Sequence, residues 1–258
     1  METVLDKAHA SMVAAPVDDA LRLRFFERFA DAELFLLLAR EADGENIEPE
    51  IFPLESGACV VAFDTEERLS AFTGRAAPFA SLSGRVLAGL LAGQGIGIGL
   101  NLGAPSEYLL SPDAVDWLAA TLAESPAEIE ERPEELHAPS GLPERLIEAL
   151  DAKLAAAEGM ADMAWLAGVT YRGGRRGHLL AFTGTLPGAE TALARAVSEA
   201  LIFSGIEAGE LDVAFLRASD PIAARLTRVA LRFDIPVPEM PAGPSAPGMD
   251  PSAPPRLK

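Results

Sequence analysis

The run GQGIGIGLN at residues 93–101 restricts the fold more than any other stretch of this chain. Glycine alternates with another residue from position 93 to position 100, and successive side chains of a β-strand point to opposite faces. The spacing therefore predicts a strand with Ile96, Ile98 and Leu100 on one face. The other face is bare, so that another segment can approach it closely. Close packing and a shallow ligand site both stay open, and packing is favoured; the residues concerned are Gly95, Gly97, Gly99 and, at the end of the strand, Asn101.

The same run excludes two other interpretations. A dinucleotide-binding loop needs the spacing G-x-G-x-x-G, and the required positions 98 and 100 are isoleucine and leucine. No Gly-Lys-Ser/Thr follows, so a P-loop is excluded too. Residues 86–106 are uncharged, but their glycines, Gln94, Asn101 and Pro105 make a membrane span unfavourable.

Charge and cysteine content narrow the class of protein. The net charge is −18 in 258 residues, with 19 acidic and 8 basic residues in positions 1–123. Such a surface repels phosphate backbones and anionic lipids, so we expect neither nucleic acid nor a membrane as a partner. The single cysteine, Cys59, cannot form an intramolecular disulfide, and no basic start followed by an apolar stretch opens the chain. We expect a cytoplasmic protein.

Composition divides the chain into five segments. Residues 124–140 are rich in glutamate and proline, which is typical of a linker, and the segment from Pro236 onward is proline-rich. The predicted order is an N-terminal tail (1–17), a first domain (18–123), an acidic linker (124–140), a second domain (141–236) and a Pro-rich tail (237–258).

Periodicity and capping residues predict two small α+β domains, each a mixed sheet flanked by helices. In the first domain we expect a β-meander over residues 33–63 and a helix over 64–72 that Asp64 caps. The other expected elements of this domain are helices at 18–29, 84–92 and 111–124 and strands at 79–83 and 95–100. The second domain is expected to contain helices at 142–159, 188–205 and 220–227, two strands around Gly173-Gly174, and strands within 211–219 and 228–236.

The hairpin YRGGRRGH at residues 171–178 is the one basic cluster that stands out in this acidic chain. Arginine presents a planar fork of donors that suits carboxylates and phosphates. One interpretation is docking onto an acidic surface, including the chain's own linker. The other, which we favour, is a solvated turn whose charges discourage aggregation. The residues concerned are Arg172, Arg175, Arg176 and His178.

Three stretches of the first domain resemble the SseB family, which is named for enhanced serine sensitivity. They are FDTEERLSAF, GIGIGLNLG and YLLSPDAVDWL, and the resemblance spans roughly residues 20–123. Residues 141–236 are similar to the family's C-terminal domain in the order of their elements. The chain departs from the family pattern in having Asn-Leu-Gly for the usual Asn-Pro-Gly, and Asp64 for a small hydroxyl residue. The resemblance implies no agreed enzymatic activity and an interaction or regulatory module.

The residues themselves show no catalytic pattern. His9, His137 and His178 are far apart, and no HExxH or GxSxG motif is present. Cys59 lies in an apolar run, as a buried inert thiol would. The acidic stretch 41–50 fails the spacing of a calcium loop. We therefore expect no catalytic residues, no cofactor and no metal site.

Together these patterns predict a non-catalytic interaction or regulatory protein with a protein partner that the sequence does not identify. The alternative is a small-molecule or anion-binding regulatory protein, with its ligand at the glycine strand or the arginine hairpin. An enzyme of unknown type would need convergent buried acids or histidines in a polar cleft.

Overall fold

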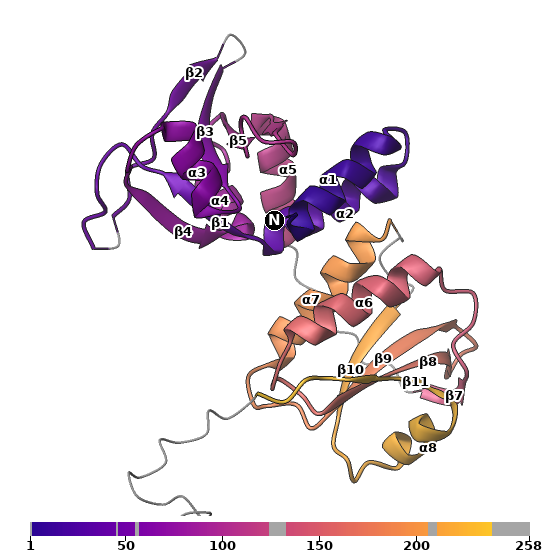
Figure 1. The fold of residues 1–258 in the computed structure, drawn as a ribbon. Helices are drawn as coiled ribbons and strands as arrows, with labels where there is room; N and C mark the ends of the chain where they lie inside the picture. The colour runs from indigo at the N-terminus through magenta and orange to yellow at the C-terminus, as the bar shows by residue number, and fades with distance from the viewer. Residues whose placement is uncertain (1, 45, 55–56, 124–132, 206–210, 239–258) are drawn as a thin grey trace, which may run out of the picture.

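The chain forms two α+β domains, each built on its own mixed sheet (Figure 1). This computed structural model describes residues 2–44, 46–54, 57–123, 133–205 and 211–238. The predicted linker therefore lies outside the described residues over 124–132, and the predicted Pro-rich tail over 239–258. Within the described residues, no helix is long and apolar enough to cross a membrane.

The first sheet has the strand order β4-β1-β3-β5-β6, and β2 also pairs with β3. Among these strands β3 and β5 are the parallel pair, and the other pairs are antiparallel. The strands are β1 (Glu33–Leu37), β2 (Phe52–Leu54), β3 (Gly57–Phe63), β4 (Phe79–Ser83), β5 (Ile96–Leu100) and β6 (Tyr108–Leu110).

The predicted β-meander is wrong in its order of pairing. In a meander β2 would lie between β1 and β3, but β1 pairs with the carboxyl end of β3 and β2 with its amino end. The seven residues of β3 are long enough for both partners along one edge, because the other edge is taken by β5. The loop between β1 and β2 is held by two isolated bridges, Leu38 with Pro49 and Asp43 with Asn46.

Two faces of the first sheet are covered unequally. One face carries the main core, in which Phe25, Phe29, Ile98 and Leu100 are fully buried. The helices of the first domain that contribute buried side chains to it are α1 (Val4–Ala14), α2 (Asp19–Asp31), α4 (Gly84–Leu91) and α5 (Pro112–Ala123). The other face is covered by the eight-residue helix α3 (Glu66–Thr73), which packs on Val61 and Phe63 through Leu69.

The N-terminal segment, residues 1–17, was predicted to be a tail, but it contains a helix that packs on the first domain. Residues 4–14 form α1, and its side chains at positions 5, 8 and 12 are buried in the core of the first domain. Thr3 caps this helix, and Asp6 returns a hydrogen bond to the Thr3 backbone, which completes a capping box. The sequence signal was present in the Thr-x-x-Asp pair and in apolar residues at i, i+3 and i+7.

The cap predicted for α3 is also one residue out of place. Thr65 is the N-cap, and its hydroxyl accepts a hydrogen bond from the Arg68 backbone amide. Asp64 does not cap the helix because its carboxylate is engaged by the Arg68 guanidinium and the Thr3 hydroxyl.

The second sheet has the order β10-β9-β8-β11, and β7 also pairs with β8. Its strands are β7 (Pro133–His137), β8 (Met163–Tyr171), β9 (Arg176–Thr183), β10 (Leu211–Leu216) and β11 (Leu231–Asp234). Helices α6 (Glu144–Ala156) and α7 (Glu190–Phe203) share a core with one face, and α8 (Pro221–Val229) packs on the other. Strand β7 falls inside the predicted linker, so residues 133–137 belong to the second sheet.

Candidate functional site: a polar cluster and an apolar face on the first domain

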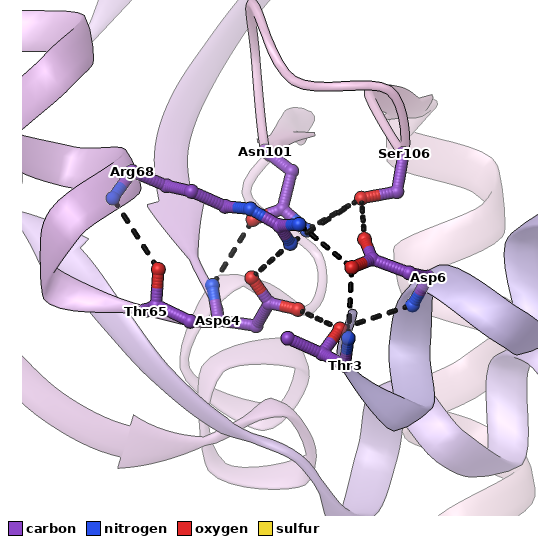
Figure 2. Close-up of polar contacts among 7 residues, drawn as sticks. All are labelled: Thr3, Asp6, Asp64, Thr65, Arg68, Asn101 and Ser106. Carbon is purple, nitrogen blue, oxygen red and sulfur yellow. Dashed lines mark hydrogen bonds and ion pairs between the residues drawn. The ribbon is translucent and has the colours of Figure 1, made fainter. Parts of the chain in front are cut away.

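A group of polar side chains meets at the carboxyl ends of the parallel strands β3 and β5 (Figure 2). Asp64 and Thr65 follow β3 directly, Asn101 follows β5, and Arg68 stands in the first turn of α3. Helix α1 brings two residues from the start of the chain to the same place. We call this group the strand-end cluster; it comprises Thr3, Asp6, Asp64, Thr65, Arg68, Asn101 and Ser106.

Asn101 and Ser106 form the buried base of the strand-end cluster. Asn101 is the one non-glycine residue among those described with a positive φ, 49°. Its Oδ1 accepts a hydrogen bond from the Asp64 backbone amide at 3.0 Å, and its Nδ2 donates to Ser106 Oγ at 3.1 Å. The Ser106 hydroxyl in turn donates to Asp6 Oδ1 at 2.5 Å. A left-handed asparagine thus ties the end of β5 to the start of α3 and orients the serine.

Arg68 joins two carboxylates in this cluster. Its Nη1 lies 2.6 Å from Asp64 Oδ1 and its Nη2 lies 2.7 Å from Asp6 Oδ2, with the side chain 19% exposed. The Thr3 hydroxyl donates to the second oxygen of Asp64 at 2.7 Å. Burial alone would raise the pKa of Asp6, but hydrogen bonds from Arg68, Ser106 and the Thr3 amide outweigh it and lower that pKa well below its usual range. The same bond with Asp6 raises the pKa of Arg68.

The chemistry of the strand-end cluster is that of carboxylate binding. A guanidinium fork and a hydroxyl converge on Asp6, and both are donors suited to a carboxylate. Asp6 and Asp64 converge here, but both are ionic partners of Arg68. The strand-end cluster contains no histidine. Within the described ranges, no three His, Cys, Asp or Glu side chains are grouped so as to hold a metal ion.

The glycine strand is β5, and its aliphatic side chains Ile98 and Leu100 are buried in the core. On the bare face, a Cβ at Gly99 would meet the Leu102 side chain at 2.9 Å, and one at Gly97 would meet the Leu110 carbonyl oxygen at 2.5 Å. The chain therefore packs closely against both glycines. Gly95 has a φ of 69° and nothing within 4 Å of its Cβ position, so it serves the turn before the strand.

A shallow pocket of about 340 Å³ opens beside Gly97 on this same face. Leu54, Cys59 and Leu109 line it together with residues 111–113 at the start of α5. Burial raises the pKa of the Cys59 thiol, which suits an inert side chain.

The face of the first sheet that carries α3 exposes a row of aromatic and aliphatic side chains. Paired residues of neighbouring strands share a face, which places the residues of this row on the side of Val61 and Phe63. Phe72 is 40% exposed and contacts Phe52 and Phe63, and Phe79 is 39% exposed and contacts Phe35. We call this surface the apolar face; it comprises Phe35, Phe52, Leu54, Phe72, Phe79 and Leu109.

The arginine hairpin connects β8 and β9, but its four predicted residues do not converge. Arg175 lies 4.2 Å over the Tyr171 ring and 2.9 Å from Asp212, which also accepts the Tyr171 hydroxyl at 2.6 Å. Burial and this acceptor raise the pKa of Tyr171. His178 Nε2 lies 3.0 Å from the carbonyl oxygen of residue 140. The two remaining residues are exposed and form no ion pair with a described residue; they are Arg172 and Arg176.

A second ionic group, which the sequence analysis missed, joins the two domains. Lys153 of α6 is 7% exposed, and its Nζ lies 2.6 Å from Asp31 and 2.9 Å from Glu199. Arg85 also binds both of these carboxylates. We call this group the interdomain cluster; it comprises Glu27, Asp31, Arg85, Lys153 and Glu199. Its sequence signal was a lysine on the apolar face of a helix, three residues after the buried Leu150.

Comparison with known proteins finds a match in the first domain. Residues 5–117 match the family model described as the SseB protein N-terminal domain. The first domain of this chain is therefore similar to the N-terminal domain of SseB proteins. The match begins within α1, so the helix that lies against Arg68 is part of the family domain. No curated protein and no solved structure matches the chain.

Proposed function

We propose that this chain is a non-catalytic interaction or regulatory protein of the SseB family, and that it contacts its protein partner through the apolar face. The observation that supports this most is the partial exposure of Phe72 and Phe79 on a sheet face that a single short helix covers. Contiguous exposed apolar side chains on a soluble domain mark interaction surfaces. Their rings make edge-to-face or tilted contacts with more deeply buried rings, so they present a fixed shape.

The charges around the apolar face indicate the chemistry of the partner. Glu66 and Glu67 are exposed on α3 itself, and positions 1–123 carry a net charge of −11. A partner with apolar side chains flanked by lysine or arginine would complement this surface. The same charge supports the proposal that nucleic acid is not the partner.

The polar groups of the chain support a non-catalytic role. The buried acids of both clusters are ionic partners of Arg68, Arg85 or Lys153, and these contacts hold helices and domains together. A general acid or base would instead need a free carboxyl beside a substrate cavity. A cytoplasmic location is proposed on the ground that the single cysteine is a buried free thiol, as is common in a reducing compartment.

A pull-down tests this function. The full chain is used as bait, under mild salt, in cells that naturally express it, beside the double variant Phe72→Ser/Phe79→Ser. The matched control is Leu186→Ser, which removes a side chain of the second domain that is 55% exposed. We expect one reproducible partner that the control retains and the double variant loses by about tenfold or more, as when central aromatic contacts are removed. No reproducible partner, or equal capture by all three proteins, would contradict the proposal.

The pocket beside Gly97 favours a second candidate, a regulatory protein that binds a small molecule. Thermal-shift screening against amino acids, nucleotides and phosphates tests it. Stabilisation by one compound that disappears in Leu54→Trp, which fills the pocket, and persists in Leu186→Trp would favour this candidate. Stabilisation that disappears in Arg175→Ala and Arg176→Ala would place the ligand at the arginine hairpin instead.

A further inference from the structure

We propose that the strand-end cluster is a binding site for the acidic N-terminal turn of a helix, which the chain's own helix α1 fills in this structure. The ligand would carry threonine or serine at the N-cap and aspartate three residues later. This site is separate from the apolar face, and the inference does not rest on the function proposed for that surface.

The cluster contacts both side chains of the α1 capping box. Arg68 Nη2 and Ser106 Oγ donate to the two oxygens of Asp6, although they lie 62 and 100 residues away in the sequence. Asp64 accepts the hydroxyl of Thr3. An ordinary capping box satisfies only its own helix. Here Thr3 and Asp6 also form hydrogen bonds with residues outside α1. The site therefore distinguishes a Thr-x-x-Asp turn from other helix starts.

The receiving side is organised by contacts that do not involve α1. Asp64 holds the Arg68 guanidinium at 2.6 Å, and Asn101 holds both the Asp64 amide and the Ser106 hydroxyl. A buried residue kept in the left-handed region is a feature that often accompanies a functional site. The cluster also lies beyond the carboxyl ends of a parallel strand pair, where ligands commonly bind in open sheets.

Helix α1 has the form of a docked peptide. It buries three side chains against the domain, Leu5, Ala8 and Met12, and it is joined to α2 by a short segment in which Val17 is 93% exposed. A helix with small or aliphatic residues at the same spacing would present the same set of side chains to the domain. Because α1 is covalently attached to the domain, its effective concentration at the site is high. The binding of a helix from another molecule is therefore measured on a chain whose connection between α1 and α2 has been cut.

The test uses the full chain with a protease site inserted between Pro16 and Val17 and cut after folding. A labelled synthetic peptide of residues 1–15 is then added, and its exchange with the cut helix is followed by fluorescence anisotropy. We expect the peptide to bind, and Asp6→Asn to weaken binding about tenfold or more, as for loss of a charged hydrogen bond. The control peptide carries Lys7→Ala at an exposed position and should bind like the natural sequence.

A double-mutant cycle separates recognition from helix capping. In cut chains that also carry Arg68→Met, the Asp6→Asn peptide should lose most of its disadvantage, because the partner of the carboxylate is gone. A pure capping effect would leave the disadvantage unchanged. That result, or equal binding of the natural and Asp6→Asn peptides, would overturn the proposal.

A measurement on the uncut chain covers the case in which cutting unfolds the domain. Asp6→Ala leaves Arg68 and Ser106 facing an empty carboxylate position, so millimolar formate or acetate should raise the melting temperature of this variant. The same salts should have no more effect than chloride on the natural protein or on Asp6→Ala/Arg68→Met. If formate and acetate act no differently from chloride on Asp6→Ala, the cluster is not a carboxylate site.

Discussion

The strand-end cluster and the interdomain cluster both neutralise acids with arginine or lysine, but Asp6 in the first and Glu27 in the second have pKa values shifted in opposite directions. In the strand-end cluster hydroxyl and amide groups supply further donors, and the pKa of Asp6 is lowered despite its burial. In the interdomain cluster three carboxylates share two cations, and Oε1 of Glu27 has no hydrogen-bond partner. Its nearest cation, Lys153 Nζ, is 3.9 Å away, which is an ion-pair contact too long for a hydrogen bond. Burial accordingly raises the pKa of Glu27.

This difference indicates what each cluster can do. In the first cluster the Arg68 guanidinium, a hydroxyl group and a backbone amide together satisfy the carboxylate of Asp6, which gives the cluster a defined geometry suited to recognition of one group. An excess of acid in the second leaves the domain contact dependent on Lys153 and Arg85. Phe203 of α7 adds an apolar contact there, since it belongs to the core of the first domain.

Removal of the central cation should have the largest effect. Lys153→Met leaves three carboxylates with Arg85 alone, and we expect it to lower the free energy of unfolding by about 3–5 kcal/mol. Urea unfolding measures this with Trp117 and Trp165, which report the first and second domains respectively. Arg24→Ala breaks the more exposed pair with Glu148 and should cost less than about 1 kcal/mol. Equal effects of the two variants would show that the interdomain cluster is not buried in solution.

Loss of the guanidinium in the strand-end cluster should cost less. Arg68→Met removes ionic hydrogen bonds to Asp6 and Asp64, and we expect a loss of roughly 2–3 kcal/mol because the site is partly open to water. The decrease should appear in the Trp117 signal and leave the Trp165 transition in place. A loss as large as that of Lys153→Met would remove the distinction drawn between the two clusters.

Asp6 of the strand-end cluster and Glu27 of the interdomain cluster should change stability with pH in opposite directions. Asp6 has a lowered pKa in the folded state, so its contribution is complete above the usual value of 3.8 and is lost as the pH falls below it. Glu27 has a raised pKa, so the folded state binds the extra proton and stability falls as the pH rises above 4.5. Urea unfolding between pH 3 and pH 8 measures both slopes after Asp6→Asn and Glu27→Gln.

The smallest expected effect is an increase in stability. Glu27→Gln should raise the free energy of unfolding at neutral pH by roughly 1 kcal/mol, since it removes a buried charge with an unpaired oxygen. The gain should shrink as the pH falls toward 4.5 and be absent below it, because the raised pKa keeps Glu27 of the natural protein protonated in the folded state there. A loss of stability at neutral pH would mean that Lys153 compensates this carboxylate fully.

Local signals in the sequence predicted most elements, and the failures have physical causes. Alternation predicted β5, and Pro112 with Ser111 predicted the start of α5, because these signals lie within a few residues. The tail assignment failed because α1 is stabilised mainly by burial against distant residues. The cap of α3 was misplaced because Asp64 binds Thr3, which lies 61 residues earlier.

The residues of the candidate sites were likewise predictable only where the signal is local in the sequence. Asn101 was singled out from the sequence as the end of the glycine strand, and the structure places it at the base of the strand-end cluster. Arg68 and Ser106 were not, because only the parallel pairing of β3 with β5 brings them together. The interdomain cluster draws on α2, α4, α6 and α7, so no pattern within one helix can predict it.

Site-specific photo-crosslinking in the native cell tests most directly whether the apolar face contacts a protein partner. A benzophenone amino acid is placed at position 72, in the apolar face, and in a separate protein at position 186, an exposed leucine of the second domain. We predict a discrete crosslinked partner from position 72 and none of that mass from position 186. Crosslinks from position 186 alone, or no crosslink from position 72, would contradict the account.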